Sequence, residues 1–95
     1  MHFITFLKTK PGFTKDELTA RRIEYVYPEN LKVVAEYWLP TDDPKVIVVL
    51  ETESVEEIFE ALRPWDQYFE ATVIPAMTAE RGLRLAHERM AVTVA

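Results

Sequence analysis

Glu36 and Glu70 are the residues of this sequence best suited to moving a proton. Each lies in the middle of a segment rich in β-branched and aromatic residues, which predicts a strand, and acidic residues are depleted in strands. Alternation along a strand places Glu36 on one face with Trp38, and Glu70 on one face with Tyr68. A carboxyl group lodged beside aromatic rings has a raised pKa and can act as a general acid or base. The alternative is that both lie on edge strands and face water, where charge discourages sheet-to-sheet aggregation.

Aromatic residues accompany these two carboxylates. We expect Trp38, Trp65, Tyr68 and Tyr25 to line a pocket for a small flat or apolar ligand, with Tyr37 beside them. The alternative is that these rings fill the core and a subunit interface, where aromatic side chains contribute the most buried area. Because Trp65 follows a proline in a connection, it can serve either as a lid over the core or as a wall of the cleft.

Residues for metal, phosphate or nucleophilic chemistry are sparse. His2 and His87 lie at opposite ends of the chain, without the spacing of a metal site, and there are no cysteines. Gly12 and Gly82 are the only glycines, so no glycine-rich phosphate-binding loop exists. Ser54, the only serine, is expected to cap a helix. We therefore expect no metal and no cofactor.

Length and charge indicate a single globular domain and argue against nucleic-acid and membrane partners. The 95 residues are enough for one domain, residues 1–95, and apolar residues make up 48% of them, as in a globular protein. The chain has 11 basic and 16 acidic residues, a net charge of −5, which argues against a nucleic-acid partner. The start lacks the pattern of a signal peptide, and the longest apolar run, residues 46–50, is too short to cross a membrane. We expect a cytoplasmic protein with no membrane partner.

The elements that must position the candidate residues follow from periodicity and turn residues. Thr14 and Ser54 each stand three residues before a glutamate, the spacing of a capping box, and predict the starts of two helices. Pro75 lies inside the last strand-like segment, which makes that strand an edge. The predicted strands are residues 2–8, 31–39, 45–52 and 67–76, and the predicted helices are residues 14–27, 54–63 and 79–90.

Each predicted helix carries an apolar stripe. The core-facing residues are expected to be Leu18, Ile23 and Val26 in the first helix, Val55, Ile58, Phe59 and Leu62 in the second, and Ala79, Leu83, Ala86 and Met90 in the third. Gly82 lies within the third helix and costs it up to ~1 kcal/mol relative to alanine.

The element order predicts an α+β, ferredoxin-like βαββαβ fold with an antiparallel sheet and an additional C-terminal helix. Two helices cover one face of such a sheet, but the third strand is apolar without alternation, so its second face needs a cover as well. An uncovered apolar face is an interaction surface. The simplest cover is the same face of a second chain, in a two-fold homodimer.

At this level of detail the sequence resembles a known family. The matching pieces are Lys10-Pro11-Gly12, Tyr37-Trp38, Glu51-Thr52, Arg63-Pro64-Trp65 and the run from Phe69 to Pro75. They resemble a prokaryotic ferredoxin-like family known as a domain of unknown function, in the dimeric α+β-barrel group, over about residues 1–77. The resemblance implies a dimeric α+β barrel. It leaves activity open, because the wider group includes cofactor-free monooxygenases, isomerases, decarboxylases, haem-handling enzymes and effector-sensing modules.

Two hypotheses follow from these observations. In the first, the protein is a homodimeric module that binds a small apolar or aromatic ligand between sheet and helices. In the second, it is a small cofactor-free enzyme of the monooxygenase or isomerase kind, with Glu36 or Glu70 as acid–base. We favour the first, because the sequence shows no nucleophile, metal set or cofactor loop.

Overall fold

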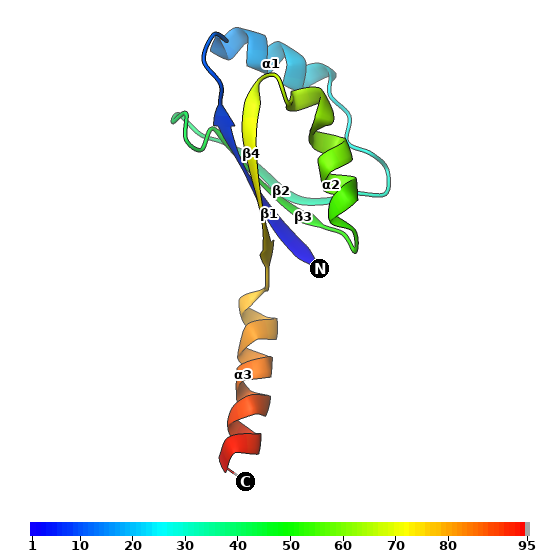
Figure 1. Cartoon of the computed structure of the whole chain (residues 1–95), viewed down its shortest axis with the longest axis vertical. Coiled ribbons are helices and arrows are strands. Elements are labelled where there is room, and N and C mark those ends of the chain that lie inside the picture. Colours follow the sequence, from blue (N-terminus) through cyan, green and yellow to red (C-terminus); the bar gives the residue numbers. More distant parts are fainter. Residues whose placement is uncertain (95) are drawn as a thin grey trace.

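The computed structural model describes residues 1–94, which form one ferredoxin-like domain and a projecting helix (Figure 1). In chain order the elements are β1 (His2–Thr9), α1 (Lys15–Glu24), β2 (Lys32–Trp38), β3 (Val46–Glu51), α2 (Val55–Leu62), η1 (Arg63–Trp65), β4 (Phe69–Ala76) and α3 (Ala79–Val94). The four strands form one antiparallel sheet in the order β2-β3-β1-β4. The predicted α+β fold is confirmed, and β4 is an edge strand, with Pro75 paired opposite Phe3.

The two predicted capping boxes have different outcomes. At α1 the backbone N–H of Glu17 donates to the Thr14 hydroxyl at 3.2 Å, as the spacing predicts. At α2 the Ser54 side chain caps nothing, and the prediction of its capping bond was wrong. The hydroxyl of Thr52 accepts from the Ser54 backbone N–H and donates to the Glu57 carboxylate, and the Glu57 backbone N–H donates to the Ser54 carbonyl at 3.2 Å, so both halves of the box are replaced.

The main core lies between the sheet and the two helices α1 and α2, which Figure 1 shows on one side of the sheet. Val46, Val48 and Leu50 of β3 face these helices and are at most 4% exposed. The predicted helical stripes are only partly correct, since Phe59, Ile23 and Val26 are 55%, 78% and 83% exposed. In α2 the buried row is centred on Ile58 and Ala61, which leaves Phe59 to one side. Val26 lies beyond the end of α1, where helical periodicity no longer applies.

The opposite face of the sheet has none of the helices within residues 1–94 packed on it. Its centre carries Ile4 and Phe6 of β1 beside Ile47 and Val49 of β3, all partly exposed. We call these four residues and Ile74 of β4, which is 45% exposed, the open face. The apolar run in β3 thus has one face covered within this chain and one face available to a partner.

The last helix, α3, extends from the end of β4 away from the rest of the domain (Figure 1), and the molecule is 58 Å along its longest axis. It continues to Val94, four residues beyond the predicted end. Leu83 and Met90 of its predicted stripe are 61% and 66% exposed, so the stripe faces no core in this chain. Across residues 1–94, the helices are all too short or too polar to cross a membrane.

Candidate functional site

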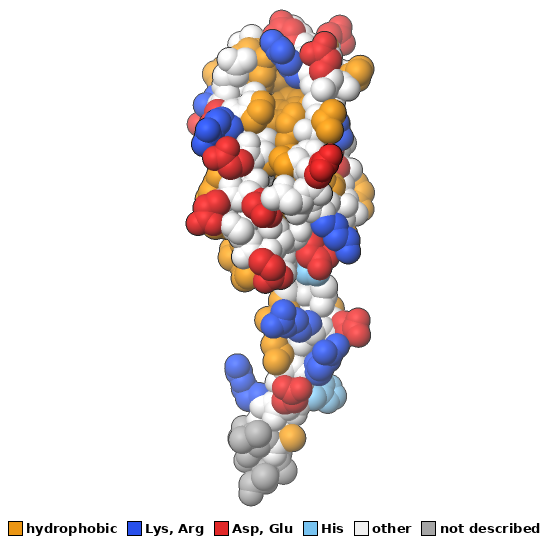
Figure 2. Space-filling model, turned by 90° about the vertical axis from the view of Figure 1, so that its right-hand side faces the viewer, with side chains coloured by type: hydrophobic (Ala, Val, Ile, Leu, Met, Phe, Trp, Pro, Cys, Tyr) orange, Lys and Arg blue, Asp and Glu red, His pale blue; other side chains and the backbone are white. Residues whose placement is uncertain are grey.

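A small cavity of about 30 Å³ lies between the sheet and the helices, in the part of the molecule where the candidate residues gather. Its lining is mostly apolar and aromatic, with Glu36, Arg22 and Thr5 as the main polar members. Figure 2, viewed from the side on which α2 lies, shows hydrophobic side chains at the bottom of a hollow in the upper part of the domain, with acidic and basic side chains around it. The remaining lining residues are Leu7, Tyr25, Tyr27, Trp38, Val46, Val48, Leu50, Ala61, Leu62, Trp65 and Phe69.

Trp65 is the centre of the aromatic cluster. It is 7% exposed and contacts the rings of Tyr25, Phe69, Tyr68 and Trp38 at centroid distances of 5.4, 5.7, 6.0 and 6.5 Å. Most of these rings meet edge-on, the arrangement that aromatic quadrupoles favour. The short helix η1 that follows the end of α2 turns Trp65 inward, so the residue is a wall of the cavity.

Glu36 is held in place by side chains from three segments. Its carboxylate accepts from Arg22 Nε at 2.6 Å and Nη2 at 2.9 Å, from the Tyr27 hydroxyl at 2.7 Å and from Trp38 Nε1 at 2.6 Å. Strand alternation in β2 puts Glu36 and Trp38 on the helix-covered face, and α1 and the segment after it supply the other two donors. The Glu36 side chain is 15% exposed.

These contacts set the protonation states around the carboxylate. Burial raises the pKa of Glu36, but the hydrogen bonds from Arg22, Trp38 and Tyr27 outweigh burial, so the net pKa is lowered. The hydrogen bond to Glu36 raises the pKa of Arg22, and burial, followed by the bond to Glu36, raises the pKa of Tyr27 well above its usual value. At neutral pH the pair is therefore a carboxylate and a guanidinium, with Tyr27 protonated.

Thr5 gives the cavity a hydrogen-bonding group without a partner. It lies on β1, its side chain faces the helix-covered side, and the residue is 0% exposed. Its hydroxyl oxygen makes no hydrogen bond to any described residue. Buried hydroxyl groups almost always have a partner, and leaving one unpaired costs about 1–3 kcal/mol. The neighbouring polar group Tyr25 is different, since its hydroxyl donates to the Ala61 carbonyl at 2.7 Å.

The structure brings together part of the predicted site. Glu36, Trp38, Trp65 and Tyr25 all line the cavity. Tyr68 is 6% exposed and lies behind Trp65, where it borders two shallower surface hollows instead.

Glu70 lies apart from the cavity. Its side chain is 65% exposed at the end of β4 and its carboxylate is 4.0 Å from the Lys8 ammonium. The water-facing alternative therefore describes its position, whereas Glu36 is turned inward. His2 lies 3.8 Å from Glu51 at the other end of the sheet, and within residues 1–94 no three His, Asp or Glu side chains gather as a metal site requires.

Besides apolar lining residues, three lining residues with hydrogen-bonding side chains were not predicted from the sequence: Arg22, Tyr27 and Thr5. Arg22 and Tyr27 flank the end of the first predicted helix, and a basic and a phenolic group there could have been matched to an inward-facing acid on the next strand. Thr5 carried a weaker signal, a lone hydroxyl between the apolar residues Ile4 and Phe6.

The cavity lining combines apolar and aromatic side chains with the buried hydroxyl group of Thr5. Apolar walls and aromatic edges favour a flat apolar body, and the Thr5 hydroxyl can donate to or accept from one polar group on it. A carboxylate with a lowered pKa that already accepts four hydrogen bonds is a weak base and is not a general acid at neutral pH. The acid–base roles of Glu36 and Glu70 stay predictions.

Comparison with protein families matches residues 1–89 to the family described as domain of unknown function DUF3303. The match reaches further than the predicted resemblance, because it includes most of α3. Comparison with curated proteins and with solved structures found no match. The matched residues cover most of the chain, and this chain belongs to the DUF3303 family.

Proposed function

We propose that this protein is a homodimeric module that binds a small aromatic molecule with one hydrogen-bonding group in the cavity between the sheet and the helices. The observation that carries the proposal is the Thr5 hydroxyl, which is fully buried, accepts and donates no hydrogen bond among residues 1–94, and lines a cavity walled by aromatic rings. A ligand that bonds this hydroxyl would remove the cost of the unpaired group, and that gain would count toward its affinity.

The size of the cavity requires one wall to move. About 30 Å³ is room for roughly one water molecule, and cavities that bind benzene are on the order of 150 Å³. Trp38 is the wall best able to move, because it lies on edge strand β2 and is 36% exposed. Its contacts are the hydrogen bond to Glu36 and edge-on contacts to Trp65 and Phe69. We expect the ligand to displace the Trp38 ring and take its place against Trp65.

The homodimer in the proposal is supported by the open face. A monomer rarely leaves a contiguous apolar sheet face in water, and a second chain is the simplest cover. Ile4, Phe6, Ile47 and Val49 supply the apolar centre, and ion pairs at both ends of the sheet supply a polar rim, as interfaces between subunits have. Native mass spectrometry of the purified protein measures this assembly and any retained ligand together.

The binding experiment compares two probe molecules of similar size, one with a hydroxyl group and one without, and a protein variant that lacks the Thr5 hydroxyl. Phenol and benzene are titrated into the ¹⁵N-labelled protein. The readout is the NMR chemical shifts of the β1 backbone amides and of the Trp38 and Trp65 indole N–H groups. The matched variant is Thr5→Val, which keeps the side-chain shape and removes the hydroxyl. We expect phenol to bind the wild type about tenfold more tightly than benzene, and Thr5→Val to remove that difference.

The stability of Thr5→Val also separates a ligand-binding hydroxyl from a purely structural one. If the unpaired group is kept for a ligand, Thr5→Val should raise the free energy of unfolding of the empty protein by about 1 kcal/mol while weakening phenol binding. Absence of shifts at the cavity with both probes would contradict the binding proposal. Equal affinities for phenol and benzene in the wild type would contradict the role of Thr5.

A further inference from the structure

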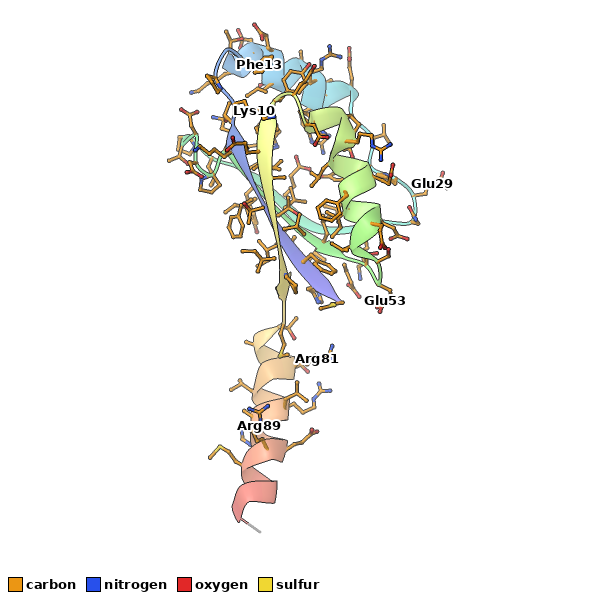
Figure 3. All side chains as sticks on the ribbon, in the orientation of Figure 1. Lys10, Phe13, Glu29, Glu53, Arg81 and Arg89 are labelled. Carbon is orange, nitrogen blue, oxygen red and sulfur yellow. The ribbon has the colours of Figure 1, made fainter. Side chains whose placement is uncertain are left out.

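The α3 helix lacks a covering surface in this chain. Figure 3 shows Arg81 near the start of α3 and Arg89 further along it, on the part of the helix that projects from the domain. The apolar side chains Leu83 and Met90 are 61% and 66% exposed. A 16-residue helix containing Gly82 is marginal in water by itself, because most helix stability in proteins comes from packing an apolar face. The helix therefore needs a surface to pack on.

The spacing of the apolar residues defines which side of α3 would pack. Ala79, Leu83, Ala86 and Met90 are separated by 4, 3 and 4 residues and lie along one side. Leu85 lies two residues from Leu83, about 200° around the helix, and so points away from this stripe.

The open face has the length and the character that this stripe requires. A helix of 16 residues is about 24 Å long, and the eight residues of β1 span about 26 Å. The face is apolar at its centre, where Ile4, Phe6, Ile47 and Val49 lie, and no helix in the described part of the same chain covers it.

The junction between β4 and α3 favours contact with another chain. The two-residue link is Met77-Thr78, and Thr78 caps the helix at once, accepting from the Arg81 N–H at 3.2 Å on its hydroxyl and from the Gly82 N–H at 2.9 Å on its carbonyl. The Met77 sulfur lies 3.4 Å from where a Cβ on Gly82 would be, so the link is packed against the first turn. These contacts start α3 directly after the end of β4, and Figure 1 shows the helix pointing away from its own sheet.

We propose that α3 of one chain packs its apolar stripe on the open face of a second copy, and that the second copy does the same in return. This inference rests on the proposed homodimer and names the element that makes the contact. Exchange of the two helices covers both open faces and both stripes, and it is a closed two-fold arrangement that does not polymerise.

The first test uses two variants of the full chain. Leu83→Glu places a charge in the stripe, and Leu85→Glu places the same charge on the other side of the same helix. Sedimentation equilibrium should show the dimer dissociation constant raised roughly ten- to hundred-fold by Leu83→Glu and nearly unchanged by Leu85→Glu. A wild-type dimer that Leu83→Glu leaves intact would overturn the helix exchange and keep the homodimer. A wild-type monomer would overturn both.

The second test separates exchange from folding back within one chain. The chain has no cysteines, so Ala86→Cys and Val49→Cys each add a single thiol. The two single variants, one carrying a purification tag, are mixed and treated with a short bismaleimide. We expect a covalent heterodimer. The double variant Ala86→Cys/Val49→Cys should give covalent dimers, and a product cross-linked only within single chains would overturn the proposal.

Discussion

Replacing Glu36 by glutamine should destabilise the protein far more than the same change at Glu70. Glu36 accepts hydrogen bonds from Arg22, Tyr27 and Trp38 and is 15% exposed. Glutamine keeps the shape, but its NH2 group cannot accept the hydrogen bonds that the second carboxylate oxygen accepts, and the Arg22 guanidinium loses its negatively charged partner. Removing one partner of a buried ion pair costs about 3–5 kcal/mol, and the 35% exposure of Arg22 reduces this to about 2–3 kcal/mol.

The assay is thermal and urea unfolding of Glu36→Gln beside Glu70→Gln. For a domain of this size, 2–3 kcal/mol lowers Tm by about 10–20 °C. Glu70 is 65% exposed and 4.0 Å from Lys8, so its variant should stay within about 0.5 kcal/mol of the wild type. If Glu36→Gln lost no more unfolding free energy than Glu70→Gln, the inward-facing and hydrogen-bonded position of the Glu36 carboxylate would be refuted.

The same variant gives a pH dependence with a definite sign. Because the folded pKa of Glu36 is lowered from 4.5, the ionised side chain contributes stability that is fully present above about pH 4.5. That contribution is lost as the pH falls through the lower folded pKa. The difference in unfolding free energy between wild type and Glu36→Gln should therefore be constant near neutral pH and shrink in acid. A difference that grows in acid would refute the assignment.

Five further substitutions form two matched pairs and one test of a backbone angle, and urea unfolding measures each of them. Ile58→Ala should cost about 2–5 kcal/mol because Ile58 is 0% exposed, whereas Phe59→Ala should cost under about 1 kcal/mol; a larger loss at Phe59 would contradict its exposed position. Thr14→Ala should cost about 1 kcal/mol by removing the α1 cap, and Ser54→Ala should cost clearly less because the Ser54 side chain caps nothing; equal losses would refute that difference. Gly12→Ala should cost about 1–2 kcal/mol because Gly12 has a φ of 101°, and no loss would mean that the turn is not held there.

The fold was predictable because its signals are local and redundant. The capping box at Thr14, the proline in β4 and the two strands on either side of the Pro44 connection all lie within a few residues of what they determine. The order of strands then follows from connection rules and needs no knowledge of packing. The errors arose where tertiary packing decides, as at Phe59, or where two hydroxyl groups compete for one role, as at Thr52 and Ser54.

The candidate site was predictable only in part, and Glu36 shows why. A glutamate in a strand of apolar residues indicates an unusual position, and it was singled out for that reason. The sequence cannot show that its partners are Arg22, from a helix 14 residues earlier, and Tyr27, from the connection that follows that helix. Those partners reverse the chemistry, because a carboxyl group beside aromatic rings alone would have a raised pKa, and this one has a lowered pKa.

Strand β1 has different kinds of side chain on its two faces. Ile4, Thr5 and Phe6 alternate, so the strand presents a hydroxyl to the cavity and two apolar side chains to the open face. In a single chain both arrangements cost free energy, the first through an unpaired polar group and the second through apolar surface left in water. A domain of this size has only about 5–15 kcal/mol of stability, so two such costs on one central strand are a large share of it. A ligand at Thr5 and a second chain on Ile4 and Phe6 would each remove one of them, and this is the physical reason to test both sides of β1 together.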